Sequence, residues 1–174
     1  GPLSGSAFFQ EYGGSLLFVT NTANPIYFAT NNRWATADMI IDAAGNVGIG
    51  ITAPNQQLEI TKNFRLPTTS GTTPYGIIYK DGSSFIHDFN YGNNGTVTTA
   101  GGNTFVGKNA GNFMMGSTAT SASEASYNTG IGAYSLYSNT TGYQNTANGY
   151  ASLFYNTTGY SNTANGYYSL YSNT

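Results

Sequence analysis

The residues from 128 onward read NTGIGAYSLYSNTTGYQ (128–144), then NTANGYASLFYNTTGYS (145–161), then NTANGYYSLYSNT (162–174). Aligned on one another, the three lines give a repeat of 17 residues. Leucine recurs in phase at Leu136, Leu153 and Leu170, and an aromatic residue follows each leucine. A unit this short cannot enclose a core of its own, so each copy must bury its apolar side chains against neighbouring copies or against other chains.

The repeat has the residue types of short strands joined by tight turns. Tyr, Phe, Thr and Ile favour strands, whereas the Asn-Gly and Thr-Gly pairs favour turns. Stacked copies would place like residues above like residues at the strand spacing of about 4.8 Å. Asn and Tyr are stabilised in such ladders, whereas a charge would face its own copy. We therefore expect a β-roll or β-helix of stacked rungs over residues 103–174, and not the disordered linker that an Asn-, Ser-, Gly- and Thr-rich composition also permits.

A looser copy of the repeat begins at Asn103 with NTFVGKNAG (103–111). It starts 25 residues before Asn128, which is about eight residues more than the period. A Ser-, Thr- and Ala-rich stretch lies between the two copies, around residues 117–126. We expect the extra residues to form a loop that leaves the stack.

Charge is scarce along the whole chain. Asp, Glu, Lys and Arg make up 7% of the 174 residues, the formal net charge is -2, and the stretch 125–174 contains none of these four types. This pattern argues against nucleic acid, acidic membranes and polycations as partners. Cysteine is absent, which excludes disulfides and thiolate chemistry. No apolar run approaches the roughly 20 residues of a membrane span, so we expect no membrane insertion by this segment.

The first half of the chain alternates short apolar runs with turns. We expect strands over 15–20, 26–29, 38–42, 46–50 and 57–60, within an N-terminal β-module spanning 7–66. Connecting strands and a hairpin should occupy 67–102, with Asp81-Gly82 as the hairpin turn. Residues 1–6, GPLSGS, resemble the remnant of a removed affinity tag, and the last repeat breaks off at Thr174, so we interpret the chain as an excised piece of a longer protein.

One segment of the module, GNVGIGITAPNQQLEI (45–60), resembles the Gly-Asn-Val-Gly-Ile-Gly-Thr-x-x-Pro-x-x-x-Leu motif of bacteriophage tail fibres and related bacterial surface proteins. Here Ile51 is inserted before the threonine, and Ala53 stands where serine is common. The resemblance implies a homotrimeric fibre, a form that such families often close with a C-terminal self-cleaving chaperone domain.

The Asn-Thr-Ala-x-Gly-Tyr repeats are similar to those in the heads of trimeric autotransporter adhesins. In that family a left-handed parallel β-roll from each of three chains packs around a common axis. Family copies carry an apolar residue where Asn148 and Asn165 stand, and Ile131 keeps that pattern. We interpret the two asparagines as the mark of a hydrated or amide-laddered centre.

The tyrosines are the candidate binding residues. Tyr143 and Tyr160 recur at the repeat period, as do Tyr150 and Tyr167. Exposed rings beside Asn and Thr can stack on sugar faces and hydrogen-bond to them, so we predict glycan contact by these four side chains. The alternative is that the rings stack as ladders or fill the centre of a trimer.

Other chemistry has weaker support. His87 next to Asp88 suggests a Ser/His/Asp triad, but no nucleophile elbow accompanies them, and a structural histidine in a hairpin is the simpler interpretation. A single histidine near a trimer axis also leaves a metal site open, because symmetry supplies three imidazoles. We expect no catalytic residue, no metal and no cofactor.

Together these features predict an all-β, non-enzymatic, homotrimeric fibre segment outside the cell, on a virion tail fibre or a bacterial surface. Its partners would be itself and a cell-surface receptor, possibly carbohydrate in nature. The head of a bacterial trimeric adhesin is the first alternative, and a β-helical polysaccharide depolymerase is the second. A solenoid that binds ice or another surface through its Thr and Asn array is a third.

Overall fold

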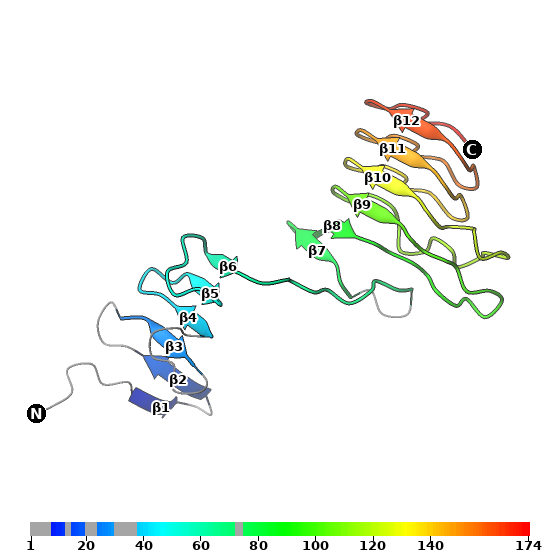
Figure 1. Ribbon diagram of the computed structural model, residues 1–174. Coiled ribbons are helices and arrows are strands. Elements are labelled where there is room, and N and C mark those ends of the chain that lie inside the picture. Colours follow the sequence, from blue (N-terminus) through cyan, green and yellow to red (C-terminus); the bar gives the residue numbers. More distant parts are fainter. Residues whose placement is uncertain (1–7, 13–14, 20–23, 30–37, 72–74) are drawn as a thin grey trace, which may run out of the picture. The chain divides into compact units, whose positions relative to one another are not determined.

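The computed structural model describes residues 8–12, 15–19, 24–29, 38–71 and 75–174, which form twelve strands (Figure 1). The chain is all-β over these residues, and none of them belongs to a helix long and apolar enough to cross a membrane. Residues 1–6, expected to be a tag remnant, lie outside the described residues. The chain divides into two compact units, Gly1–Arg65 and Leu66–Thr174, which we call unit 1 and unit 2.

Unit 1 contains two small sheets. In the first, β1 (Phe8–Tyr12) pairs antiparallel with β2 (Ser15–Val19). The second has the order β3-β4-β5-β6. Its strands are β3 (Ile26–Phe28), β4 (Met39–Ile41), β5 (Val47–Ile49) and β6 (Leu58–Ile60). The five strands predicted in this part of the chain are confirmed, with ends within one residue of expectation.

The glycine-rich segment of unit 1 forms β5 and its flanking turns. β5 pairs antiparallel with β4 and parallel with β6. A Cβ on Gly48 would come within 2.9 Å of Ile40 Cγ2 and 2.7 Å of the Ile51 carbonyl oxygen, so glycine lets the strand pack closely on buried Ile40. Before β5, Asp42 Oδ1 accepts hydrogen bonds from the amides of Ala44 (2.9 Å) and Asn46 (2.8 Å). The bond from the Asn46 amide in particular lowers the pKa of Asp42.

Unit 2 is built on one six-stranded sheet of order β12-β11-β10-β9-β8-β7 (Figure 1). The strands are β7 (Ile78–Lys80), β8 (Ser83–His87), β9 (Thr104–Val106), β10 (Thr129–Ile131), β11 (Thr146–Asn148) and β12 (Thr163–Asn165). β9 to β12 pair in parallel, whereas β7, β8 and β9 pair antiparallel. The predicted hairpin turn is confirmed: Asp81 and Gly82 join β7 to β8 with φ of 50° and 71°, the positive values of a type I′ turn.

The repeat period sets the register of the parallel strands. Thr129 lies opposite Thr146, and Thr146 opposite Thr163, so paired residues are 17 positions apart. Between β9 and β10 the shift is 25, because Thr104 lies opposite Thr129. The amide of Gly116 donates to Thr140 O (2.7 Å) and that of Ala125 to Thr141 O (3.0 Å). Residues 117–124 therefore leave the stack between these two bonds, as the loop expected from the alignment.

Each repeat of unit 2 forms one coil of the stack. The core of the unit consists of small and large side chains that lie above one another in successive coils. Phe105, Gly130, Ala147 and Ala164 occupy the inward position of successive strands, with Phe105 fully buried. A Cβ on Gly130 would come within 2.9 Å of the Phe105 ring, so the absence of a side chain there makes room for the phenyl group. Leu136 and Leu153, both fully buried, extend the same cluster.

Each coil turns its corners with left-handed residues at equivalent positions. Leu136 and Leu153 have φ of 52° and 51°, values that an L-residue adopts at some energetic cost. Glycine is required where the backbones of adjacent coils touch. A Cβ on Gly132 would lie 2.5 Å from the Gly149 carbonyl oxygen, and one on Gly149 would strike Gly166 in the same way.

Asparagine side chains form two ladders inside the coils. Asn145 Nδ2 donates to Asn128 Oδ1 (3.2 Å), and Asn162 Nδ2 donates to Asn145 Oδ1 (3.1 Å). A second ladder repeats this pattern through Asn139, Asn156 and Asn173. The inner members are fully buried, so stacked amides satisfy one another where no water reaches.

The asparagines singled out in the sequence are not in these ladders. Asn148 and Asn165 are exposed on the outer face of β11 and β12, so the expectation that they mark an amide-laddered interior of the chain is wrong. The reason is strand alternation: Ala147 and Ala164 point inward, so the next residue on each strand must point outward.

Candidate binding surface

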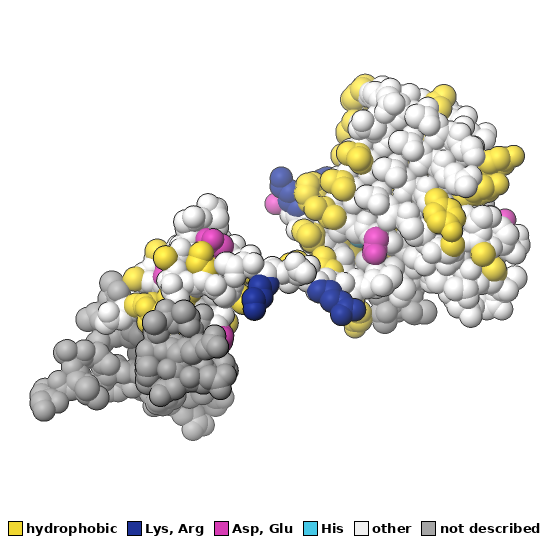
Figure 2. All heavy atoms as spheres, in the orientation of Figure 1, with side chains coloured by type: hydrophobic (Ala, Val, Ile, Leu, Met, Phe, Trp, Pro, Cys, Tyr) yellow, Lys and Arg dark blue, Asp and Glu magenta, His cyan; other side chains and the backbone are white. Residues whose placement is uncertain are grey.

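Aromatic rings gather in a contiguous cluster on the outer side of the repeats, which we call the aromatic wall. Its members are Tyr134, Tyr137, Tyr150, Phe154, Tyr155, Tyr167, Tyr168 and Tyr171. Its longest column stacks Tyr137 on Phe154 (centroids 5.1 Å apart, planes at 18°) and Phe154 on Tyr171 (5.2 Å, 28°). Figure 2 shows hydrophobic side chains of unit 2 at two separate edges of the repeats, with polar surface between them.

The four predicted tyrosines fall into two separate ladders. Tyr150 and Tyr167 belong to the aromatic wall, with centroids 5.3 Å apart and planes at 16°. Tyr143 and Tyr160 stack on each other at 4.9 Å and 6°. Among the described residues no ring contact joins the second pair to the wall, so the four side chains do not form one site.

Stacking in these ladders uses part of each ring face. The near-parallel planes mean that each ring covers some of its neighbour, which is the ladder arrangement considered above as the alternative to sugar contact. The rings still present edges and hydroxyls to solvent, and Tyr150, which has a ring stacked on it, is 41% exposed. The nearby Tyr168 phenol raises the pKa of Tyr150 above its usual value.

The longest column of the wall begins beside a hollow that the sequence did not predict. The register shift of 25 places Asn112 at the position equivalent to Tyr137 in the preceding coil. A hollow of about 390 Å³ lies there, lined by Ser84, Asn109, Gly111, Asn112, Phe113, Met114 and Tyr137. The sequence signal was present but overlooked: the looser copy has an amide where the later copies have an aromatic ring.

The polar groups of this hollow differ in what they bind. Asn112 is committed to the fold, since its Nδ2 donates to Tyr137 O (3.1 Å) and to Asn139 O while its Oδ1 accepts from the Met114 amide (2.9 Å). The Ser84 hydroxyl and the Asn109 side chain make no hydrogen bond to the described part of the chain. These two groups are therefore available to a ligand.

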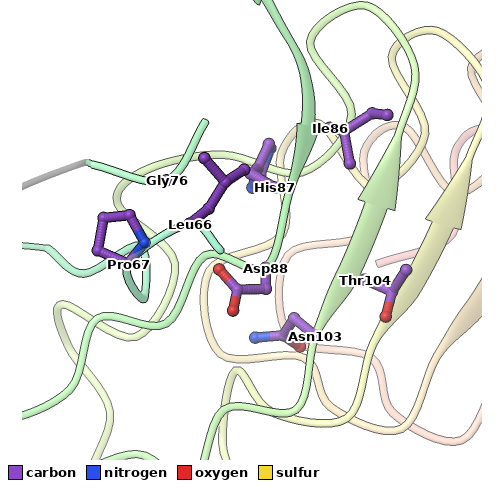
Figure 3. A pocket seen from close by; sticks show the side chains of 8 residues that line it. All are labelled: Leu66, Pro67, Gly76, Ile86, His87, Asp88, Asn103 and Thr104. Atoms are coloured by element: carbon purple, nitrogen blue, oxygen red, sulfur yellow. The ribbon is translucent and has the colours of Figure 1, made fainter. Parts of the chain in front are cut away.

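A second cavity, of about 260 Å³, lies beside β8 and includes His87, Asp88 and Asn103 (Figure 3). His87 is buried, its Nε2 lies 2.9 Å from Ala110 O, and its Nδ1 accepts the Phe89 amide (3.3 Å). Nε2 therefore carries the proton of a neutral ring, and burial lowers the pKa of His87. Both nitrogens bind the main chain, so the side chains of this stretch do not assemble a Ser/His/Asp triad.

Two other polar side chains of this cavity, Asp88 and Asn103, also bind the main chain. Asp88 Oδ1 accepts the Thr69 amide (3.2 Å), and Asn103 Nδ2 donates to Phe89 O and Ala125 O, both at 2.9 Å. Among the described residues no three His, Asp or Glu side chains are grouped so as to hold a metal ion.

Comparisons of the chain with models of protein families, with curated proteins and with solved structures found no match. What the chain does must therefore be inferred from its own residues.

Proposed function

We propose that this chain is a non-catalytic recognition segment of an extracellular homotrimeric fibre, of the bacteriophage tail-fibre type, that attaches to glycans on a cell surface. The observation that carries this proposal is the aromatic wall, a large exposed patch of rings on the outside of the repeats. Contiguous apolar surface of this kind marks interaction sites. Tyrosine combines an apolar ring for the C–H face of a sugar with a hydroxyl for its polar edge.

The proposed assembly is supported by a row of apolar side chains on the outer face of the unit 2 sheet. Ile78 lies opposite Ile86, Ile86 opposite Val106, and Val106 opposite Ile131. We call these four residues the outer row; the three isoleucines are 39%, 38% and 45% exposed. Association with further copies of the chain would remove this row from water.

Unit 1 gives independent support for assembly. Among the side chains described there, Ile40 is buried, whereas Tyr27, Phe28, Leu58 and Phe64 are exposed. Association with other chains would remove these four exposed side chains from water. Three is the number of chains in the fibres and adhesins that the sequence resembles, and threefold repetition strengthens weak receptor contacts through avidity.

Binding suits the composition of the repeats better than cleavage does. Glycoside hydrolysis uses a pair of carboxyl groups, and residues 125–174 contain no Asp or Glu. The aromatic wall carries no charge, so it can bind neutral sugar surfaces. Such binding needs no catalytic group.

Two measurements test the proposal. Light scattering after size exclusion should give about three times the 18.4 kDa chain mass, and a glycan array should show binding with no new reducing ends. Tyr155→Ser and Tyr167→Ser should each reduce array binding by about tenfold or more, because each change removes three rings from a trimer. Thr158→Ser, at an exposed site with no aromatic ring, is the matched control. A compact monomer, or release of reducing ends, would overturn the proposal.

A further inference from the structure

Building on the proposed glycan attachment, we infer that the hollow lined by Ser84, Asn109, Asn112, Met114 and Tyr137 is a subsite for one neutral pyranose residue. Its volume of about 390 Å³ lies near the lower end of the roughly 300–1,000 Å³ typical of small-molecule sites. The hollow lies where the aromatic period fails, in the coil that has Asn112 in place of an aromatic ring.

At the hollow, Tyr137 offers a ring face that Phe154, in the middle of the column, does not. Phe154 is stacked on both sides, by Tyr137 (5.1 Å) and by Tyr171 (5.2 Å). Tyr137 has a stacked ring on one side only, since the equivalent position in the preceding coil is Asn112. A sugar ring entering the hollow can take the place that an aromatic ring holds elsewhere in the column.

Two unpaired polar groups stand close to that ring face. The backbone N–H of Asn109 donates a hydrogen bond to the backbone carbonyl oxygen of Ser84 (3.0 Å), which holds the two residues next to each other. Neither the Asn109 side chain nor the Ser84 hydroxyl is bonded to the described part of the chain, and both line the hollow. Together they offer donors and acceptors to the hydroxyls of a pyranose.

The lining also selects the class of sugar. All seven lining residues are uncharged. The carboxylate of an acidic sugar would lose water in the hollow without gaining a cationic partner, which is unfavourable. A neutral hexose or N-acetylhexosamine has no such penalty, and Met114, 63% exposed at the edge, adds an apolar contact.

The test uses saturation-transfer NMR and calorimetric titration of the full chain with methyl glycosides of glucose, galactose and N-acetylglucosamine, and with methyl glucuronide as the charged match. We expect a neutral glycoside to bind and the glucuronide to bind more weakly. Asn109→Gly should weaken binding about fivefold. Glycine suits the φ of 53° at this site, so the fold is kept. Tyr137→Leu should weaken binding about tenfold, and Thr158→Ser, at an exposed site outside both the hollow and the aromatic wall, should leave it unchanged.

The outcomes separate this inference from the proposed function. If Tyr167→Leu abolishes binding while Asn109→Gly and Tyr137→Leu do not, the ladders bind the glycan and the hollow does not. If no neutral glycoside binds while the glycan array stays positive, the subsite is likewise refuted and glycan attachment stands. A trimer that binds nothing on the array would refute both.

Discussion

The buried asparagine ladder gives the sharpest test of how the repeats hold together, through the substitution Asn145→Ala. Asn145 is fully buried and makes four side-chain hydrogen bonds. Its Nδ2 donates to Asn128 Oδ1 (3.2 Å) and Gly159 O (2.7 Å). Its Oδ1 accepts from the backbone N (3.0 Å) and the Nδ2 (3.1 Å) of Asn162.

The size of the effect follows from which partners are left without a bond. Asn128 Oδ1 keeps the backbone amide of residue 145 (3.1 Å), and Gly159 O keeps Asn156 Nδ2 (3.1 Å). The Asn162 backbone N–H and its side-chain amide lose their shared acceptor. Each of the four lost hydrogen bonds contributes a net stabilisation of about 1 kcal/mol. Because Asn128 Oδ1 and Gly159 O each keep another hydrogen bond, the total loss is smaller than the sum of the four. Asn145→Ala should therefore lower the free energy of unfolding by about 3 kcal/mol.

Urea unfolding followed by far-UV circular dichroism measures this loss, at one protein concentration for all variants because an oligomer's stability depends on it. Asn148→Ala is the matched control, since Asn148 lies three residues away, is exposed, and makes no side-chain hydrogen bond to the described part of the chain. It should change stability by less than about 0.5 kcal/mol. Equal losses in the two variants, or a loss below about 1 kcal/mol for Asn145→Ala, would refute the view that the buried ladder stabilises the stack.

Three further results are expected. Leu153→Ile should lower the free energy of unfolding by about 1–2 kcal/mol more than Leu153→Met, because Leu153 is fully buried at φ 51°, where a β-branched residue is strained; equal losses in urea melts would contradict this. His87 is the only histidine, and its lowered folded pKa means that stability is full above the unfolded pKa of about 6.5 and falls as pH drops from there toward the folded value. Urea midpoints at several pH values should show the fall, and an NMR pKa for His87 at or above 6.5 would exclude it. Ile131→Asn, which copies the residue of the next two coils, should shift the light-scattering mass of the proposed trimer toward that of a monomer at low concentration; an unchanged dissociation constant would show that the outer row is not part of the proposed interface.

Much of the local structure could be predicted from the sequence. The 17-residue period predicted the register of the parallel strands, and Asp81-Gly82 predicted the hairpin turn. The eight extra residues predicted a loop. The stacking of Tyr143 on Tyr160 also followed from their phase. These features depend on nearby residues or on the identity of residues one period apart, and both are visible in the sequence.

The direction of each side chain was decided only by the tertiary structure. Asn145 and Asn148 are the same residue type three positions apart, yet the first is buried in a ladder and the second faces outward. The chain turns at residues such as Leu136, which has a left-handed backbone conformation although it is not glycine. Residue propensities therefore do not predict these turns. The hollow beside Tyr137 likewise exists only because β8 and the preceding coil place Ser84, Asn109 and Asn112 around it. Period and strand content are local or self-repeating properties, whereas burial and the shape of a site depend on how coils far apart in the chain pack on one another.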